Sequence, residues 1–173
     1  MKIKTYKWLT TVLLAICHAM AVAGQDGKTN CLIMGDSIAV GLGRIAKECE
    51  SIAQVKATSK NYFDLLEKFE PNIWDGARID AGRLIISLGA FDEKSAKTYE
   101  YLLRLRAMLN AHQITWVVPQ PGKSQDKSID VLRVAAGYGD QVVYIKPQYL
   151  SRDGRTPTIK GYMEIIKSAG LEL

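Results

Sequence analysis

The sequence predicts a three-layer α/β domain in which helices cover both faces of a parallel sheet. Short apolar runs alternate along the chain with longer segments whose apolar residues recur at helical spacing, as in consecutive strand–helix units. The first run, Cys31–Met34, is continuously apolar and leads into Gly35-Asp36-Ser37. We expect a strand that is buried on both faces and turns sharply into a helix, so that Ser37 lies at the carboxyl end of the strand.

The first half of the chain is expected to hold two strand–helix units. A helix over 38–48 follows the first strand, and a second strand is expected over 51–57. The next helix, over 61–70, should stop at Pro71, because proline lacks a backbone N–H and clashes with the preceding helical turn. The segment 71–82 contains two glycines and is expected to be irregular.

The second half of the chain is expected to add three strands. The run 83–88, which ends in Gly89, is the clearest internal strand, and a long amphipathic helix is expected over 93–112. The remaining elements are expected at 114–118 (strand), 128–138 (helix), 141–145 (strand) and 158–169 (helix). The sequence therefore predicts five strands in a single domain over 24–173, without internal repeats.

The amino terminus is typical of a secretory signal peptide. Three lysines precede an apolar run over 8–23, which ends in the small residues Ala21-Val22-Ala23. We expect cleavage before Gly24, and therefore a periplasmic or secreted protein. An uncleaved membrane anchor is the alternative, although the run of 16 residues is shorter than the roughly 20 residues that span a bilayer.

The charge balance excludes a nucleic-acid-binding surface. Three of the 23 Lys and Arg residues lie before residue 24, where there is no Asp or Glu, so cleavage leaves 20 minus 18, or +2. No cluster of Cys and His has metal-ligand spacing, and no phosphate-binding glycine loop is present. The glycines at 41 and 43 fall inside a predicted helix, so they form no dinucleotide motif. We expect neither a metal nor a cofactor.

Two cysteines remain after cleavage, Cys31 and Cys49. Cys31 begins the first predicted strand and Cys49 follows the first predicted helix. Because the strand and the helix run in opposite directions, both cysteines should lie at the same edge of the sheet. Export permits a disulfide between them. A disulfide is predicted, with free buried thiols as the alternative.

Three motifs occur along the chain in the order and spacing of the SGNH (GDSL-like) hydrolase family. They are Gly35–Ala39, Ser87–Asp92 and Asp153–Thr158. The sequence resembles this family over nearly all of the mature chain. The resemblance implies a flavodoxin-like sheet with strand order 2-1-3-4-5 and an esterase-type site at the carboxyl edge of the strands.

The resemblance also assigns roles to individual residues. In the family, a serine nucleophile is activated by an Asp-x-x-His pair, and its own N–H, a glycine N–H and an asparagine side chain form the oxyanion hole. The matching positions here are Ser37 (nucleophile), Ser59 (glycine), Phe91 (asparagine), Asp153 (aspartate) and Thr156 (histidine), and Gly89 and Asp92 are expected in the same pocket.

Two of these positions lack the required chemistry. Thr156 cannot act as a general base near neutral pH, and Phe91 has no polar atom to donate to an oxyanion. Lys60 and Lys123 are expected on loops at the correct edge and could replace the base if they were desolvated. His112, the only histidine after residue 24, is expected at a helix end at the opposite edge.

Two functions remain open at this point. The favoured hypothesis is an exported, catalytically impaired protein of the SGNH fold that binds an acylated or carbohydrate ligand, or an envelope protein, at the carboxyl edge. The alternative is an acyl or acetyl esterase in which Ser37 is activated by a non-standard base. The loss of the base favours the first, because fold alone does not carry activity.

Overall fold

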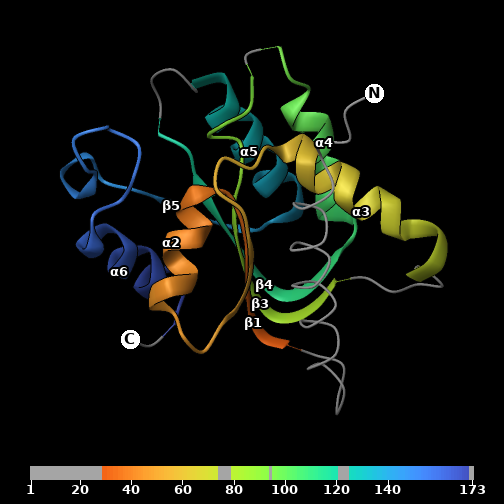
Figure 1. The fold of residues 1–173 in the computed structure, drawn as a ribbon, viewed down its shortest axis with the longest axis horizontal. Helices are drawn as coiled ribbons and strands as arrows, with labels where there is room; N and C mark the ends of the chain where they lie inside the picture. Colours follow the sequence, from red (N-terminus) through yellow and green to blue (C-terminus); the bar gives the residue numbers. More distant parts are fainter. Residues whose placement is uncertain (1–28, 74–78, 94, 121–124, 172–173) are drawn as a thin grey trace, which may run out of the picture.

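The computed structural model describes residues 29–73, 79–93, 95–120 and 125–171. One five-stranded sheet has the order β2-β1-β3-β4-β5, and every neighbouring pair is parallel (Figure 1). The strands are β1 (Thr29–Gly35), β2 (Glu50–Ala53), β3 (Ile79–Ser87), β4 (Leu109–Val118) and β5 (Gln141–Tyr144). The predicted fold class and strand order are confirmed.

Helices pack on both faces of this sheet. They are α2 (Ser37–Ile45), α3 (Ser59–Ile73), α4 (Thr98–Ala107), α5 (Gln125–Tyr138) and α6 (Ile159–Ser168), and a short 3-10 helix, η1 (Pro147–Tyr149), precedes α6. Alternate residues of β1 point into different cores: Ile33 packs with the buried residues of α2 and α6, and Met34 packs with those of α3, α4 and α5. This double burial explains why the β1 sequence is continuously apolar.

β3 and β4 both begin earlier than the sequence predicts. β3 starts at Ile79 instead of 83, and β4 starts at Leu109, within the segment predicted as helix 93–112. The two extensions pair with each other, with Ile79 opposite Leu109. Backbone hydrogen bonds therefore stabilise a strand pair whose side chains give no clear alternating pattern. α4 is correspondingly shorter, at ten residues.

Other boundaries also differ from prediction; for example, α2 ends at Ile45 instead of 48, and α5 starts at Gln125 instead of 128. α3 does not stop at Pro71 but ends at Ile73, a shift that lies within the usual uncertainty of helix ends. β2 ends at Ala53 instead of 57, because the chain turns there: the N–H of Ala57 donates to the Gln54 carbonyl, and Lys56 adopts a left-handed conformation with φ of 60°. This turn becomes important for the site.

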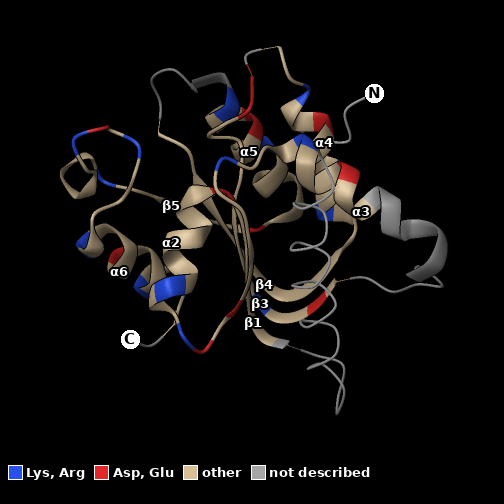
Figure 2. Ribbon diagram, in the orientation of Figure 1, with Lys and Arg blue, Asp and Glu red and all other residues tan. Residues whose placement is uncertain are grey.

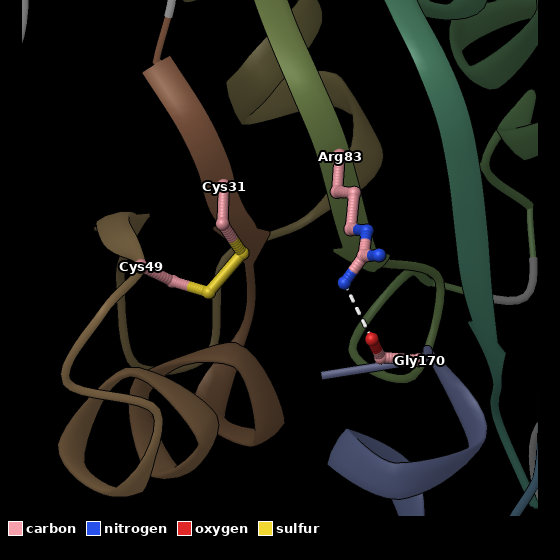
Figure 3. The surroundings of a disulfide bond; sticks show 4 residues. All are labelled: Cys31, Cys49, Arg83 and Gly170. Atoms are coloured by element: carbon pink, nitrogen blue, oxygen red, sulfur yellow. Dashed lines mark hydrogen bonds between the residues drawn. A yellow bond between two sulfur atoms is a disulfide. The ribbon is translucent and has the colours of Figure 1, made fainter. Parts of the chain in front are cut away.

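Cys31 and Cys49 form a disulfide (Figure 3). It joins β1 to the segment between α2 and β2, near the amino-terminal edge of the sheet. In the same region the Arg83 guanidinium of β3 donates a hydrogen bond to the Gly170 carbonyl, just after α6 (Figure 3). These two links stabilise the edge opposite Ser37.

The predicted signal peptide, residues 1–23, lies outside the described residues. Among the residues that the structure describes, none of the helices combines the length and the apolar character needed to cross a bilayer.

Candidate functional site

A close approach between β1 and β3 places Ser37 at the carboxyl edge of the sheet. Gly35 has φ of 137°, and a Cβ at this position would lie only 1.9 Å from the Ser87 carbonyl oxygen, so a larger residue could not be accommodated. The next N–H, that of Asp36, donates to the same carbonyl at 2.8 Å. Ser37 then begins α2. Because β1 lies between β2 and β3, the serine emerges from the interior of the sheet.

The Asp36 carboxyl group stabilises this turn. Its Oδ1 accepts hydrogen bonds from the Ile38 N–H and from the Ser87 hydroxyl, both at 2.9 Å, so it caps α2 and links it to β3. The side chain is fully buried, and Oδ2 has no hydrogen-bond partner among the described residues. Burial raises the pKa of Asp36 to about 6, although the two hydrogen bonds oppose the shift.

The Ser37 hydroxyl oxygen accepts a hydrogen bond from the Lys56 N–H, with an N···O distance of 3.0 Å. Lys56 lies in the loop between β2 and α3. This contact resembles the oxyanion-type donor that the family supplies from its second block, although the sequence analysis assigned that position to Ser59. The sequence did not indicate that Lys56 would contact Ser37, because lysine is not typical of a left-handed turn position.

The Ser59 N–H has a different partner. It donates to Asp92 Oδ1 at 2.8 Å, and the Thr98 hydroxyl donates to Asp92 Oδ2 at 2.6 Å. Ser59 is the first residue of α3 and Thr98 the first of α4. Asp92 therefore joins the starts of two helices, and its carboxylate is occupied by these contacts. The Ser59 hydroxyl is buried without a partner among the described residues.

Tyr62 holds the β2–α3 loop against the end of β1. Its buried hydroxyl accepts the Gly35 N–H at 3.0 Å and lies 2.9 Å from the Gly35 carbonyl and 2.5 Å from the Ile52 carbonyl, either of which can take its proton. Burial raises the pKa of Tyr62 far above its usual value, so the phenol remains protonated. A core residue thus fixes the loop that contacts Ser37.

Asp153 and Thr156 interact with each other. Asp153 accepts hydrogen bonds from the Thr156 hydroxyl (2.5 Å) and N–H (2.9 Å), from the Arg155 N–H (2.9 Å) and from the Ser151 hydroxyl (2.9 Å). These bonds, the Thr156 hydroxyl first among them, hold the pKa of Asp153 well below its usual range. The loop is exposed. Where the family has a histidine oriented by aspartate, this chain has a closed turn.

Tyr162 of α6 lies between the two regions. Its ring packs against α2 so closely that a Cβ at Gly41 would approach it to 2.3 Å. Burial raises the pKa of Tyr162, and the negative charges of Asp36 and Asp153 raise it further. Because Tyr162 follows the Asp153–Thr158 motif closely in the chain and its ring contacts Gly41 of α2, this packing brings the first and last motifs to one part of the edge. Tyr162 lies four residues after the last motif and had no predicted role.

The other predicted pocket residues lie in the loop after β3. Gly89 is buried with φ of 97°, and Phe91 is half-buried. An aromatic side chain thus occupies the sequence position at which the family has its asparagine donor. The predicted pocket residue Asp92 follows in the same loop, where it makes the contacts described above.

None of the described residues supplies an evident base for Ser37. Lys60 is exposed and forms an ion pair with Asp64 one helical turn away. Lys123 lies outside the described residues. His112 is exposed on the amino-terminal half of β4, not at a helix end. By the strand register it lies five residues before the position of β4 that is level with Gly35, which is about 16 Å along the strand.

The described residues contain no group of three or more His, Cys, Asp or Glu side chains arranged to hold a metal ion. The groups that the structure places at this edge include a buried carboxyl group, a serine hydroxyl held by a backbone N–H, and an exposed loop with a hydrogen-bonded aspartate.

No protein-family model and no curated protein sequence matches the chain. Solved structures do match its fold. A GDSL-like lipase from Bacteroides thetaiotaomicron is 16% identical, with a TM-score of 0.61 over 88% of this chain and 92% of the lipase. The C-terminal catalytic domain of peptidoglycan O-acetyltransferase A from Streptococcus pneumoniae is 15% identical, with a TM-score of 0.52 over 82% of this chain and 92% of that domain.

A third similar structure is a two-domain esterase active on acetylated mannans. It is 14% identical, with a TM-score of 0.50, and the match covers 91% of this chain and 52% of the esterase. Identities this low concern the fold and not the activity. The chain therefore has the three-layer flavodoxin-like fold of the GDSL-like and SGNH hydrolases.

Proposed function

We propose that this protein is exported and binds an O-acylated glycan at the carboxyl edge around Ser37 without hydrolysing it through that serine. The observation that carries the proposal is the closed turn formed by Asp153 and Thr156. Its aspartate accepts four hydrogen bonds from its own loop. Its threonine stands where the resemblance to the SGNH family would place the general base.

The expected loss of catalysis is large. Removing the base of a serine triad costs on the order of a millionfold in turnover, and removing an oxyanion donor about a hundred- to a thousandfold, with strong non-additivity. Here the histidine is replaced by Thr156 and the asparagine by Phe91. Retained binding is compatible with both changes, because binding requires neither proton transfer nor charge stabilisation.

The ligand class is proposed from two lines of support. Two of the similar structures are a peptidoglycan O-acetyltransferase and an esterase active on acetylated mannans, so this fold is used with acetylated glycans. Loops at the same edge also present apolar side chains: Val55, which precedes Lys56, is 59% exposed, and Phe91 in the β3–α4 loop is half-buried. Such side chains can contact a sugar face or an acyl group.

A second candidate function is an esterase of low activity. The hydrogen bond from the Lys56 N–H to the Ser37 hydroxyl favours it, because a backbone donor beside the serine is what an oxyanion hole requires. This candidate needs a base for Ser37. Lys60, which is paired with Asp64, and Lys123, which lies outside the described residues, are the first to test.

Calorimetric titration separates the two candidates when it is combined with an esterase assay. We expect the mature protein to bind O-acetylated oligosaccharides about tenfold more tightly than deacetylated ones, since one buried methyl group and one hydrogen bond contribute about 1.4 kcal/mol or more. We also expect equal hydrolysis of a short acetyl ester by the protein and by Ser37→Ala. Fast hydrolysis that Ser37→Ala abolishes would instead establish the esterase.

Export has its own test. Intact-mass measurement of the protein recovered from the cell envelope should show a chain that begins at Gly24. A chain that retains Met1 would support a membrane anchor instead.

A further inference from the structure

We propose that the Lys56 side chain determines specificity at this edge by selecting glycan ligands that carry carboxylate groups. The inference rests on the proposed function and deepens it, because it names the charge of the glycan. The Lys56 side chain would act through its ammonium group, whereas its N–H contacts Ser37.

The position of Lys56 is fixed by its backbone. The N–H donates to the Ser37 hydroxyl at 3.0 Å, and the Cα atom lies only one bond, about 1.5 Å, beyond that nitrogen. The side chain therefore starts beside Ser37, and its flexible four-carbon stem carries the ammonium over the surrounding surface. Any ligand that contacts the serine lies within reach of this cation.

The backbone conformation of Lys56 favours glycine, not lysine. With φ of 60°, it is the only non-glycine residue of the described chain in the left-handed region. A Cβ atom is unfavourable there, and glycine would avoid this cost. A lysine at this position consequently requires an explanation from its side chain, and residues in this conformation are concentrated at functional sites.

At this edge the aspartate carboxylates accept hydrogen bonds from the protein itself, whereas Lys56 has no ion-pair partner among the described residues. Asp36 is buried, Asp92 joins two helices, and Asp153 is satisfied within its loop. Lys56, by contrast, is exposed and forms no ion pair with a described residue.

Basic residues also lie across the edge. Figure 2 shows Lys and Arg in the β2–α3 loop and in the loop that precedes α6, where Arg152 and Arg155 are exposed. Glu93 is an exposed carboxylate in the β3–α4 loop, and it is the exception to this pattern. Asp153 is also exposed and stays ionised, so its charge offsets one of these cations. The exposed cations Lys56, Arg152 and Arg155 still outnumber the exposed carboxylates Glu93 and Asp153, which favours a ligand that carries a carboxylate.

The test compares two probes of equal length, an O-acetylated oligogalacturonide and an O-acetylated manno-oligosaccharide, in calorimetric titrations of the mature protein. We expect the acidic probe to bind about fivefold more tightly in 50 mM NaCl, as for one exposed ion pair. The preference should decrease in 500 mM NaCl, because salt screens exposed charges. Lys56→Gln should abolish it, so that the two probes bind with equal affinity.

Two further variants complete the experiment. Lys56→Gly suits the left-handed backbone and should fold at least as stably as the parent, so its loss of preference cannot be attributed to unfolding. Lys60→Gln removes a lysine in the first turn of α3, not in the loop as predicted, that is already paired with Asp64, and it should retain the preference. Equal binding of both probes, or a preference that survives Lys56→Gln, overturns this inference alone. Binding of neither probe overturns the proposed function as well.

Discussion

Replacement of Asp36 by asparagine should stabilise the protein at neutral pH, because the carboxyl group is buried without a compensating charge. Its pKa is about 6 in the folded state, against an ordinary value of 3.8. The difference of 2.2 units corresponds to about 3 kcal/mol, at about 1.4 kcal/mol per unit. The folded state therefore binds this proton more tightly than the unfolded state, and the associated stability is present below about pH 4 and is lost as the pH rises through 6.

Asparagine retains the oxygen that accepts hydrogen bonds from Ile38 and Ser87, and it carries no charge. Asp36→Asn should therefore match the parent near pH 4 and exceed its free energy of unfolding by about 1 to 3 kcal/mol at pH 7.5, the lower value allowing for an amide N–H without a partner. Urea unfolding followed by circular dichroism at pH 4, 5, 6 and 7.5 measures this difference, in which contributions from other groups cancel. Parallel pH profiles for the two proteins, or a variant less stable at pH 7.5, would refute the reasoning.

Three further predictions concern stability and catalysis. Replacing Cys31 and Cys49 by serine should lower the free energy of unfolding by about 3 kcal/mol from the entropy of the 18-residue loop; equal urea midpoints would contradict this. Tyr62→Phe leaves buried backbone groups unpaired and should cost about 1 to 3 kcal/mol in the same assay, whereas an unchanged midpoint would show that the hydroxyl contributes nothing. Combining Phe91→Asn with Thr156→His should produce slow turnover of a short acetyl ester that a further Ser37→Ala change removes; turnover that survives this change would not come from the site.

The parts of the fold that could be predicted are those in which burial dictates residue type. β1 and α2 follow from a continuously apolar run and a glycine turn, because both faces of the central sheet are covered. The extensions of β3 and β4 could not be predicted, since Asp80, Asn110 and His112 are exposed and the pairing depends on backbone hydrogen bonds that any residue except proline can make.

The candidate site could likewise be predicted only in part. The serine, the aspartate and the absence of a histidine beside them were visible in the sequence. The role of Asp92 and the contact of Lys56 with Ser37 were not, because each joins segments that are far apart in the chain. Ser59 and Asp92 are separated by 33 residues. No local sequence pattern indicates which backbone N–H will donate a hydrogen bond to a given carboxylate.

The disulfide has a consequence for proteolysis. Cys31 and Cys49 close a covalent ring that contains the end of β1, the turn to Ser37 and the whole of α2. Arg44 and Lys47 lie within this ring and are exposed, so both are accessible to trypsin. A single cut at either residue would separate β1, which lies between β2 and β3, from the other strands in sequence, yet the two fragments would stay linked through the disulfide. The nicked protein should migrate as one band on a denaturing gel and divide into two only after reduction.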